Sequence, residues 1–436
     1  MSDLSVDEQV KLLMRGVVYG DEGVARAMEG ELRERLAEGR PLRVYLGIDP
    51  TAPDLTLGHT VPMRKLRQFQ RLGHEAVLLI GGYTALVGDP SDRETTRPML
   101  TLEEIEANGR TYAEQAFKIL DPERTVIRNN AEWLSKLTFE ELIKIASNFT
   151  VGQFLQRDNF ARRRERGDPI FVHEFFYAFM QAYDAVALQT DAQVGATEQL
   201  FNLMAGRALQ RVYGQRPQVA ICMPILVGTD GRLRMSKTQG NYIALNDPPD
   251  EMYGKVMSLP DDVMIDYFTL VTEVPEEEIE EVRRKLVERS VNPMDVKKRL
   301  AREIVGELHS PKAAAKAEEN FARTFQLREI PEDVVEYRMS LLRDHKIVAK
   351  TVERLGAGPA KETYDTWKDL AGVLHRSGLA SSISEARRLI EQGAVEIYTP
   401  EGVRKIDTRL VLLRDGDMIR VGKHRFLRIV DADKHA

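Results

Sequence analysis

The chain has 436 residues, of which 43% are hydrophobic and 30% are charged, so it is long enough for two or three domains and has the composition of a folded globular protein. The single cysteine, Cys222, excludes a disulfide within the chain and a zinc site built from several cysteines, which favours a reducing, cytoplasmic compartment. An apolar run of about 18 residues and a basic-then-apolar leader are both missing, so no membrane partner is expected.

The first 245 residues alternate between helical and strand patterns. Apolar residues recur at helical spacing between residues 6 and 38, and the segment RVYLGIDP that follows resembles a strand running into a loop. A helical pattern at 61–72 and an apolar, glycine-terminated segment at 76–82 complete a β-α-β unit. Further strands are expected at 125–128 and 219–227, and further helices at 102–119, 139–147 and 173–188. The predicted fold class is therefore α/β, with a doubly wound parallel sheet in a domain over residues 1–245.

The rest of the chain changes character twice. Residues 246–345 contain long, charged helical patterns such as EEEIEEVRRKLVERS and are expected to form a separate helical domain. A Gly- and Pro-containing stretch lies in an expected linker at 346–366. Residues 367–431 read as a helix followed by short strands, which predicts a small α+β domain. The net charge of the whole chain is −6, but Lys and Arg outnumber Asp and Glu from residue 367 onward, so the C-terminal end is the basic one.

Nucleotide chemistry is indicated by the segment YLGIDPTAPDLTLGHT at 45–60, in a chain that has neither a P-loop nor a G-x-G-x-x-G sequence. Strand alternation places Tyr45, Gly47 and Asp49 on one face, at the carboxyl end where open α/β sheets bind ligands. Gly58 and His59 follow at the start of the next helix, whose N–H groups suit a triphosphate. Taken alone, this pair is explained more simply as a loop end and a helix cap.

A second segment, GRLRMSKTQGNY at 231–242, strengthens the nucleotide interpretation. It places Arg234, Ser236 and Lys237 on a loop flanked by glycines after an apolar strand. Basic and hydroxyl side chains on such a loop can hold a leaving pyrophosphate by charge stabilisation, without covalent chemistry.

The two segments together resemble the HIGH and KMSKS motifs of class I aminoacyl-tRNA synthetases, at residues 50–59 and 234–238. The resemblance implies a Rossmann-like catalytic domain that uses ATP with Mg²⁺ as its substrate complex and holds no tightly bound metal of its own. It also implies that Glu198 takes the place of an aspartate that contacts the ribose. Three further positions depart from the family pattern, namely Thr56, Ala196 and Arg234. The catalytic residues implied are Thr51, His59, Arg93, Arg97, Arg234 and Lys237, and the ATP-binding residues implied are Gly47, Asp49, Thr56, Gly58, His59, Glu198, Met235, Ser236 and Lys237.

Two patterns are similar to the tyrosyl branch of that family. One is the frame Y-x-G-x-D-P-T-x-x-x-L-x-x-G-H, and the other is Y-x-x-x-Q-x-x-D at 177–184, whose three polar residues would share one stripe of a helix. A phenol and a carboxylate around a substrate hydroxyl would reject phenylalanine, because that substrate leaves buried polar groups unpaired. The resemblance implies that Tyr45 and Asp184 bind the phenol of tyrosine and that Asp89, Tyr177 and Gln181 bind its ammonium group. The full set of expected tyrosine-binding residues is Tyr45, Asp89, Tyr177, Gln181, Asp184 and Gln199.

The C-terminal segments ISEARRLIEQGAV and DGDMIRVGKHRFLRI resemble an S4-type RNA-binding module. Its basic side chains could contact phosphates, although a solvated basic surface is an equally good account of any one arginine. By resemblance, the helical domain recognises the anticodon of tRNA(Tyr) and the protein is a homodimer, with neither DNA nor a membrane as a partner. The expected RNA-binding residues are Arg387, Arg388, Arg420, Lys423 and Arg425.

Two rival functions stay open at this point. The departures from the motifs would suit a weakened synthetase paralogue that acts as an RNA-binding protein, although such a protein would not need an amino-acid pocket beside a phosphate clamp. The second rival is an enzyme that activates tryptophan. Tyr45 and Asp184 disfavour it, because indole offers only a donor at its polar edge.

Overall fold

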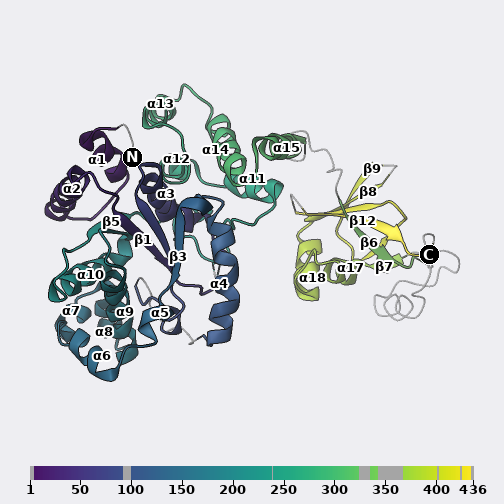
Figure 1. The fold of residues 1–436 in the computed structure, drawn as a ribbon. Coiled ribbons are helices and arrows are strands. Elements are labelled where there is room, and N and C mark those ends of the chain that lie inside the picture. Colours follow the sequence, from purple (N-terminus) through teal and green to yellow (C-terminus); the bar gives the residue numbers. More distant parts are fainter. Residues whose placement is uncertain are drawn as a thin grey trace, which may run out of the picture. The chain divides into compact units, whose positions relative to one another are not determined.

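The computed structural model describes residues 4–91, 100–237, 239–323, 334–341, 367–399, 402–422 and 425–433. The chain divides into two compact units, Met1–Glu318 and Glu319–Ala436, which are described separately (Figure 1). No helix in the described part is long and apolar enough to cross a membrane.

The first unit is built on a five-stranded parallel sheet with the strand order β3-β2-β1-β4-β5. The first three strands follow one another in one direction from β1, and the last two lie on its other side. The direction of winding therefore reverses between β1 and β4, which is where a doubly wound sheet opens a crevice for ligands. The strands are β1 (Arg43–Ile48), β2 (Glu75–Ile80), β3 (Thr125–Asn129), β4 (Ala192–Ala196) and β5 (Val219–Met223).

The predicted α/β class and parallel sheet are confirmed, and strand β4 was missed. This strand contains Gln193, which is buried and accepts a hydrogen bond from the Gln218 amide at 2.6 Å. A polar residue in the middle of a short strand breaks the hydrophobic pattern, and only its partner elsewhere in the fold makes the burial tolerable.

Helices pack around this sheet. Helix α3 (Leu57–Arg71) packs against β1, β2 and β4. Helix α9 (Val172–Leu188) covers the sheet face that carries Tyr45, where Ala185 and Leu188 meet Val77 and Leu79. The remaining helices of this part are α1 (Val6–Met14), α2 (Glu22–Ala37), α4 (Leu102–Ala116), α5 (Ala131–Leu134), α6 (Phe139–Ala146), α7 (Val151–Leu155), α8 (Asp158–Arg166) and α10 (Leu200–Val212).

A group of helices after residue 246 stays in the same compact unit as the sheet. Ion pairs hold it there, since Arg67 of α3 pairs with Glu307 at 2.8 Å and Arg71 also pairs with Glu273. The helices are α11 (Pro249–Met257), α12 (Met264–Val271), α13 (Glu276–Val287), α14 (Pro293–Leu308) and α15 (Pro311–Phe321).

The second unit has a five-stranded sheet with the order β6-β12-β11-β8-β9 and a two-stranded pair, β7 and β10. Its first strand, β6 (Val335–Met339), pairs in parallel with β12. The sequence analysis placed these residues in a helical domain that runs to residue 345, whereas the structure places them in the sheet of the second unit. Residues of the expected linker at 346–366 lie outside the described residues. The other elements are β7 (Trp367–Asp369), α17 (Leu370–Arg376), α18 (Ile383–Glu391), β8 (Val395–Thr399), β9 (Gly402–Ile406), β10 (Leu410–Leu412), β11 (Met418–Val421) and β12 (Arg425–Asp431).

Candidate active site

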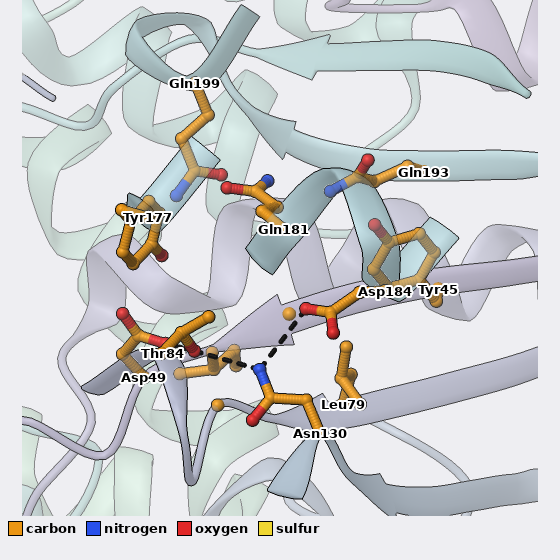
Figure 2. A pocket seen from close by; sticks show the side chains of 13 residues that line it. Tyr45, Asp49, Leu79, Thr84, Asn130, Tyr177, Gln181, Asp184, Gln193 and Gln199 are labelled. Carbon is orange, nitrogen blue, oxygen red and sulfur yellow. Dashed lines mark hydrogen bonds between the residues drawn. The ribbon is translucent and has the colours of Figure 1, made fainter. Parts of the chain in front are cut away.

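A cavity opens at the carboxyl end of β1, where the winding of the sheet reverses. In Figure 2, Tyr45 and Asp184 lie at one end, Tyr177 and Gln199 at the other, and Gln181 between them. The cavity is thus lined by side chains from segments far apart in the sequence. The full lining is Tyr45, Gly47, Ile48, Asp49, Leu79, Gly81, Thr84, Asn130, Tyr177, Gln181, Asp184, Gln193 and Gln199.

Tyr45 and Asp184 form the buried end of the cavity, with exposed fractions of 0% and 3%. Among the described residues, the Tyr45 hydroxyl makes no hydrogen bond, and the nearby Gln218 side chain bonds to Gln193 and Thr190. Burial, and then the charge of Asp184, hold the pKa of Tyr45 well above its usual range. Burial also raises the pKa of Asp184 to about 8. A ligand hydroxyl at this end would give the buried Tyr45 hydroxyl a hydrogen-bond partner, and a buried hydroxyl is costly to leave unpaired.

Three side chains that the sequence analysis missed fix the position of Asp184. Trp133 donates from Nε1 to its Oδ1 at 2.7 Å, and Asn130 donates from Nδ2 to its Oδ2 at 3.2 Å. The Asn130 amide also reaches Thr84 Oγ1 at 3.0 Å, and Thr84 donates to Asp49 Oδ1 at 2.7 Å (Figure 2). Asn130 and Thr84 follow the carboxyl ends of β3 and β2, so the rule that singled out Asp49 after β1 could have found them.

Glycine is required where β2 ends. A Cβ on Gly81 would lie 1.9 Å from Asp49 Oδ1 and 2.5 Å from Thr84 Oγ1. Any side chain there would displace the carboxylate and break the hydrogen-bond chain that leads to Asp184.

The opposite end of the cavity carries Tyr177, Gln181 and Gln199. The predicted i, i+4, i+7 stripe of α9 is formed, because Tyr177, Gln181 and Asp184 all face the cavity. Burial, and then the Asp49 carboxylate, raise the pKa of Tyr177, while Gln181 Oε1 is buried and has no hydrogen-bond partner in the described part of the chain. Asp89 does not line the cavity but accepts a hydrogen bond from Gln199 Nε2 at 3.1 Å. Acceptor oxygens therefore gather here, which suits a cationic group.

The HIGH-like segment starts helix α3, as predicted. Thr56 caps this helix, and His59 Nδ1 lies 3.0 Å from the Thr56 N–H and 2.9 Å from its Oγ1. The backbone donor makes Nδ1 an acceptor and leaves the proton of the neutral ring on Nε2. Desolvation by the surrounding protein, followed by the positive charges of Lys237 and Arg234, lowers the pKa of His59, although part of the residue is exposed. His59 is therefore a neutral donor at pH 7.

The KMSKS-like loop lies against the HIGH-like segment. The chain just after the loop meets the HIGH-like segment where Leu57 N donates to Ile243 O at 2.8 Å, and Lys237 Nζ of the loop pairs with Asp54 Oδ2 at 3.2 Å. A Cβ on Gly58 would lie 3.8 Å from Met235 Cβ. The two predicted nucleotide segments thus converge at the N-terminus of α3, which is the arrangement that a triphosphate site requires.

Asn241, a residue the sequence analysis did not single out, shapes this loop. Its Oδ1 accepts from Ser236 N at 2.8 Å, and its Nδ2 donates to Asp230 Oδ2 at 2.9 Å and to Arg234 O at 3.1 Å. A Cβ on Gly228 would collide with this amide at 2.3 Å. One buried side chain therefore holds the turn that presents Arg234, Ser236 and Lys237.

The structure says less about the remaining predicted residues of the site. Thr51 is half-buried in the loop after β1, where its N–H donates to Asp49 O at 2.8 Å, and Glu198 is half-buried beside Gln199. Arg93 and Arg97 lie outside the described residues. Across the part of the chain that the structure describes, no three acidic, His or Cys side chains form a group suited to a metal ion.

The predicted RNA-binding residues of the second unit differ in their environment. Arg387 and Arg388 are exposed on α18. Arg420 pairs with Glu396 at 2.6 Å and lies over the Tyr398 ring, and Arg425 donates to Leu379 O. Lys423 is outside the described residues. The two α18 arginines are therefore the ones most open to a phosphate.

Comparison with known proteins adds a family to this geometry. A family model described as tRNA synthetases class I (W and Y) matches residues 37–326, and an S4 domain model matches residues 370–397. A Thermotoga maritima protein named tyrosine–tRNA ligase is 48% identical over 427 residues, 98% of each chain. A Moorella thermoacetica protein of the same name is 48% identical over 426 residues, 97% of this chain and 96% of that protein.

Solved structures share the fold of the first unit. A C-terminally truncated mitochondrial tyrosyl-tRNA synthetase of Aspergillus nidulans has a TM-score of 0.59 at 24% identity and covers 74% of this chain and 94% of its own. An Archaeoglobus fulgidus tyrosyl-tRNA synthetase complexed with L-tyrosine has a TM-score of 0.56 at 23% identity, over 72% of this chain and 100% of its own. At these identities the likeness concerns the fold alone.

Proposed function

The chain belongs to the class I tRNA synthetases for tryptophan and tyrosine, and from that membership and the site geometry we infer a tyrosine–tRNA ligase. The enzyme activates L-tyrosine with ATP, releasing pyrophosphate, and transfers the amino acid to the 3′ end of tRNA(Tyr) for protein synthesis. The observation that carries this conclusion is the cavity that joins Tyr45 and Asp184 at its closed end to Gln181 and Gln199 at the other.

The choice of tyrosine follows from the closed end of the cavity. A phenol placed there donates to Asp184 and supplies the Tyr45 hydroxyl with its missing partner. Phenylalanine would leave the Tyr45 hydroxyl buried and unpaired, at a cost of about 1–3 kcal/mol, and would place an apolar ring edge against the Asp184 carboxyl group. Tryptophan would offer a single N–H donor in a larger ring. At the other end, Tyr177, Gln181 and Asp89 would hold the ammonium group, with Gln199 alongside.

Activation requires the tyrosine carboxylate to attack the α-phosphorus of ATP. We assign the adenosine side of ATP to Gly47, Asp49 and Glu198, and its phosphates to the N-terminus of α3 at Thr56–His59 and to the loop with Arg234, Met235, Ser236 and Lys237. Mg²⁺ arrives with ATP as part of the substrate. These groups stabilise charge that grows on the leaving pyrophosphate, so no side chain has to act as a nucleophile. Thr51, Arg93 and Arg97 are proposed to help in the same way.

The tRNA side of the reaction involves the C-terminal unit and the helices after residue 246. Arg387 and Arg388 of α18 would bind RNA phosphates, together with Arg420, Lys423 and Arg425. The helical region would read the anticodon. The enzyme would work in the cytoplasm, where its tRNA substrate is found.

A homodimer is supported by apolar side chains on the outside of the first unit. Helices α6, α7 and α9 share a hydrophobic cluster, yet each also exposes apolar residues, and β3 is an edge strand that does the same. We propose that these exposed apolar side chains form the dimer interface. The exposed residues are Val126 and Ile127 of β3, Phe139 and Ile143 of α6, Val151 of α7, and Phe171 and Val172 at the start of α9.

The test is ATP–pyrophosphate exchange with tyrosine, phenylalanine and tryptophan in parallel, followed by charging of tRNA(Tyr). Exchange with tyrosine alone, and tyrosylation of the tRNA, are expected. Exchange with tryptophan would move the protein to the other branch of its family. Retained RNA binding without exchange for any amino acid would identify the rival function, a paralogue that acts only as an RNA-binding protein.

A further inference from the structure

A buried arginine lies just ahead of α8, outside the set of residues assigned to the reaction. Arg157 is only 8% exposed, and its guanidinium sits over the rings of Phe201 at 4.8 Å and Phe160 at 5.3 Å. Among the described residues, no carboxylate lies within ion-pair distance of it, and its Nη1 has no hydrogen-bond partner. A buried cation held by a hydroxyl group and aromatic rings, and not by a close ion pair within the described residues, costs stability, so an apolar residue would suit this aromatic pocket better.

Within the described ranges, the guanidinium makes one side-chain hydrogen bond, and it leads toward the cavity. Arg157 Nη2 donates to Ser91 Oγ at 2.5 Å. Two neighbours hold the same short segment, since Asn159 Nδ2 donates to Pro90 O at 2.8 Å and Asn202 Nδ2 reaches Ser91 Oγ at 3.5 Å. The segment Asp89–Ser91 is thereby fastened to the start of α8 and to α10.

This fastening sets the position of Asp89. Its Oδ1 accepts from Ser91 N at 2.8 Å, and its Oδ2 accepts from Gln199 Nε2 at 3.1 Å. Gln199 lines the cavity beside Tyr177, at the end away from Asp184 (Figure 2). A path of direct contacts therefore runs from Arg157 through Ser91 and Asp89 to the end of the cavity that we assign to the ammonium group.

We propose that Arg157 is a positioning residue for amino-acid recognition, which holds Ser91 so that Asp89 and Gln199 face the substrate ammonium. This inference deepens the proposed function and rests on it. The charge of Arg157 acts in the opposite direction, because a nearby cation repels the ammonium group and competes for Asp89. Positioning predicts weaker ammonium binding when Arg157 is removed, whereas a pure charge effect predicts tighter binding.

The experiment uses the full-length protein and three ligands that share a phenol. L-Tyrosine and tyramine carry the ammonium group, and 3-(4-hydroxyphenyl)propionate lacks it. Their affinities are measured by calorimetry, with competition against tyrosine for the weak ligands. We expect Arg157→Met to weaken tyrosine and tyramine about tenfold, the loss of one hydrogen bond to a charged group, and to leave the propionate unchanged. Ser91→Ala, which keeps the buried guanidinium, should give the same selective loss.

Arg163→Met is the matched control. Arg163 lies in α8, is also buried, and also lies over Phe160, but its hydrogen bonds go to Glu174 and to Pro169 O instead of to the Asp89–Ser91 segment. Its replacement should lower the melting temperature without selecting between ligands. The inference would be overturned if Arg157→Met weakened all three ligands equally or bound the two amines more tightly. It would also be overturned if Ser91→Ala bound all three ligands with the affinities of the parent protein. Failure of the parent protein to bind tyrosine at all would instead overturn the proposed function.

Discussion

Replacing Asp184 by asparagine should separate the stability of the empty cavity from its affinity for tyrosine. Burial raises the pKa of Asp184 to about 8, although Trp133 and Asn130 donate to it. The folded state then keeps a proton that the unfolded chain, with a pKa near 4, has lost, so stability falls as the pH rises between these two values. Between pH 5 and pH 8 this group costs the folded state up to about 4 kcal/mol.

Asparagine does not titrate, so the variant should escape this loss. Trp133 and Asn130 donate to different carboxyl oxygens, and asparagine turns one of these into an NH2 donor that faces another donor, which costs about 1–3 kcal/mol at every pH. The pH dependence is therefore the informative quantity. Relative to the parent, the melting temperature of Asp184→Asn should improve by on the order of 8 °C between pH 5 and pH 8.

The assay is differential scanning calorimetry of both proteins at the two pH values, following the transition of the first unit. Asp191→Asn serves as the control, because Arg40 holds the pKa of Asp191 low despite its burial, and that contribution is lost only in more acidic solution. It should lose the same stability at pH 5 and pH 8. A parallel pH dependence of parent and Asp184→Asn would refute the reasoning. The same variant should bind tyrosine about tenfold more weakly, because one of the two carboxyl oxygens that face the ligand phenol is replaced by an amide donor.

Three further perturbations test other parts of the site. Lys237→Ala should lower the rate of adenylate formation about 100-fold and change the tyrosine dissociation constant less than about threefold. Equal losses in pyrophosphate exchange and in equilibrium binding of tyrosine would exclude a role for Lys237 in the transition state. Gly81→Ala should abolish measurable tyrosine binding, because the added Cβ would lie 1.9 Å from Asp49 Oδ1. The control, Gly109→Ala in α4, should bind normally, because its Cβ would meet its nearest neighbour at 3.6 Å. Normal binding by both variants would show that the site tolerates a side chain at residue 81. Val172→Glu replaces a residue that is 70% exposed at the start of α9, where the helix dipole tolerates an acid. Analytical ultracentrifugation should show a shift from dimer to monomer. An unchanged dimer would exclude this surface as the interface.

Local pattern was sufficient to predict the parts of the site that lie on one element. Alternation along β1 put Tyr45 and Asp49 on one face, and the helical period put Tyr177, Gln181 and Asp184 on one stripe, as the lining of the cavity confirms. The α/β class followed from the alternation of patterns, and the position of His59 at a helix start followed from the strand before it. Each of these conclusions needs only the geometry of a single strand or helix.

The partners of those residues were decided by the tertiary structure. The sequence around Asp184 does not predict its partners Trp133 and Asn130, which lie more than 50 positions away in the chain. Strand β4 escaped notice because Gln193 is buried through a bond to Gln218 on another segment, and Arg157 meets Ser91 only because two helices and a loop pack together. Periodicity states which residues share a face, whereas the meeting of separate segments depends on the packing and hydrogen bonding of the whole fold.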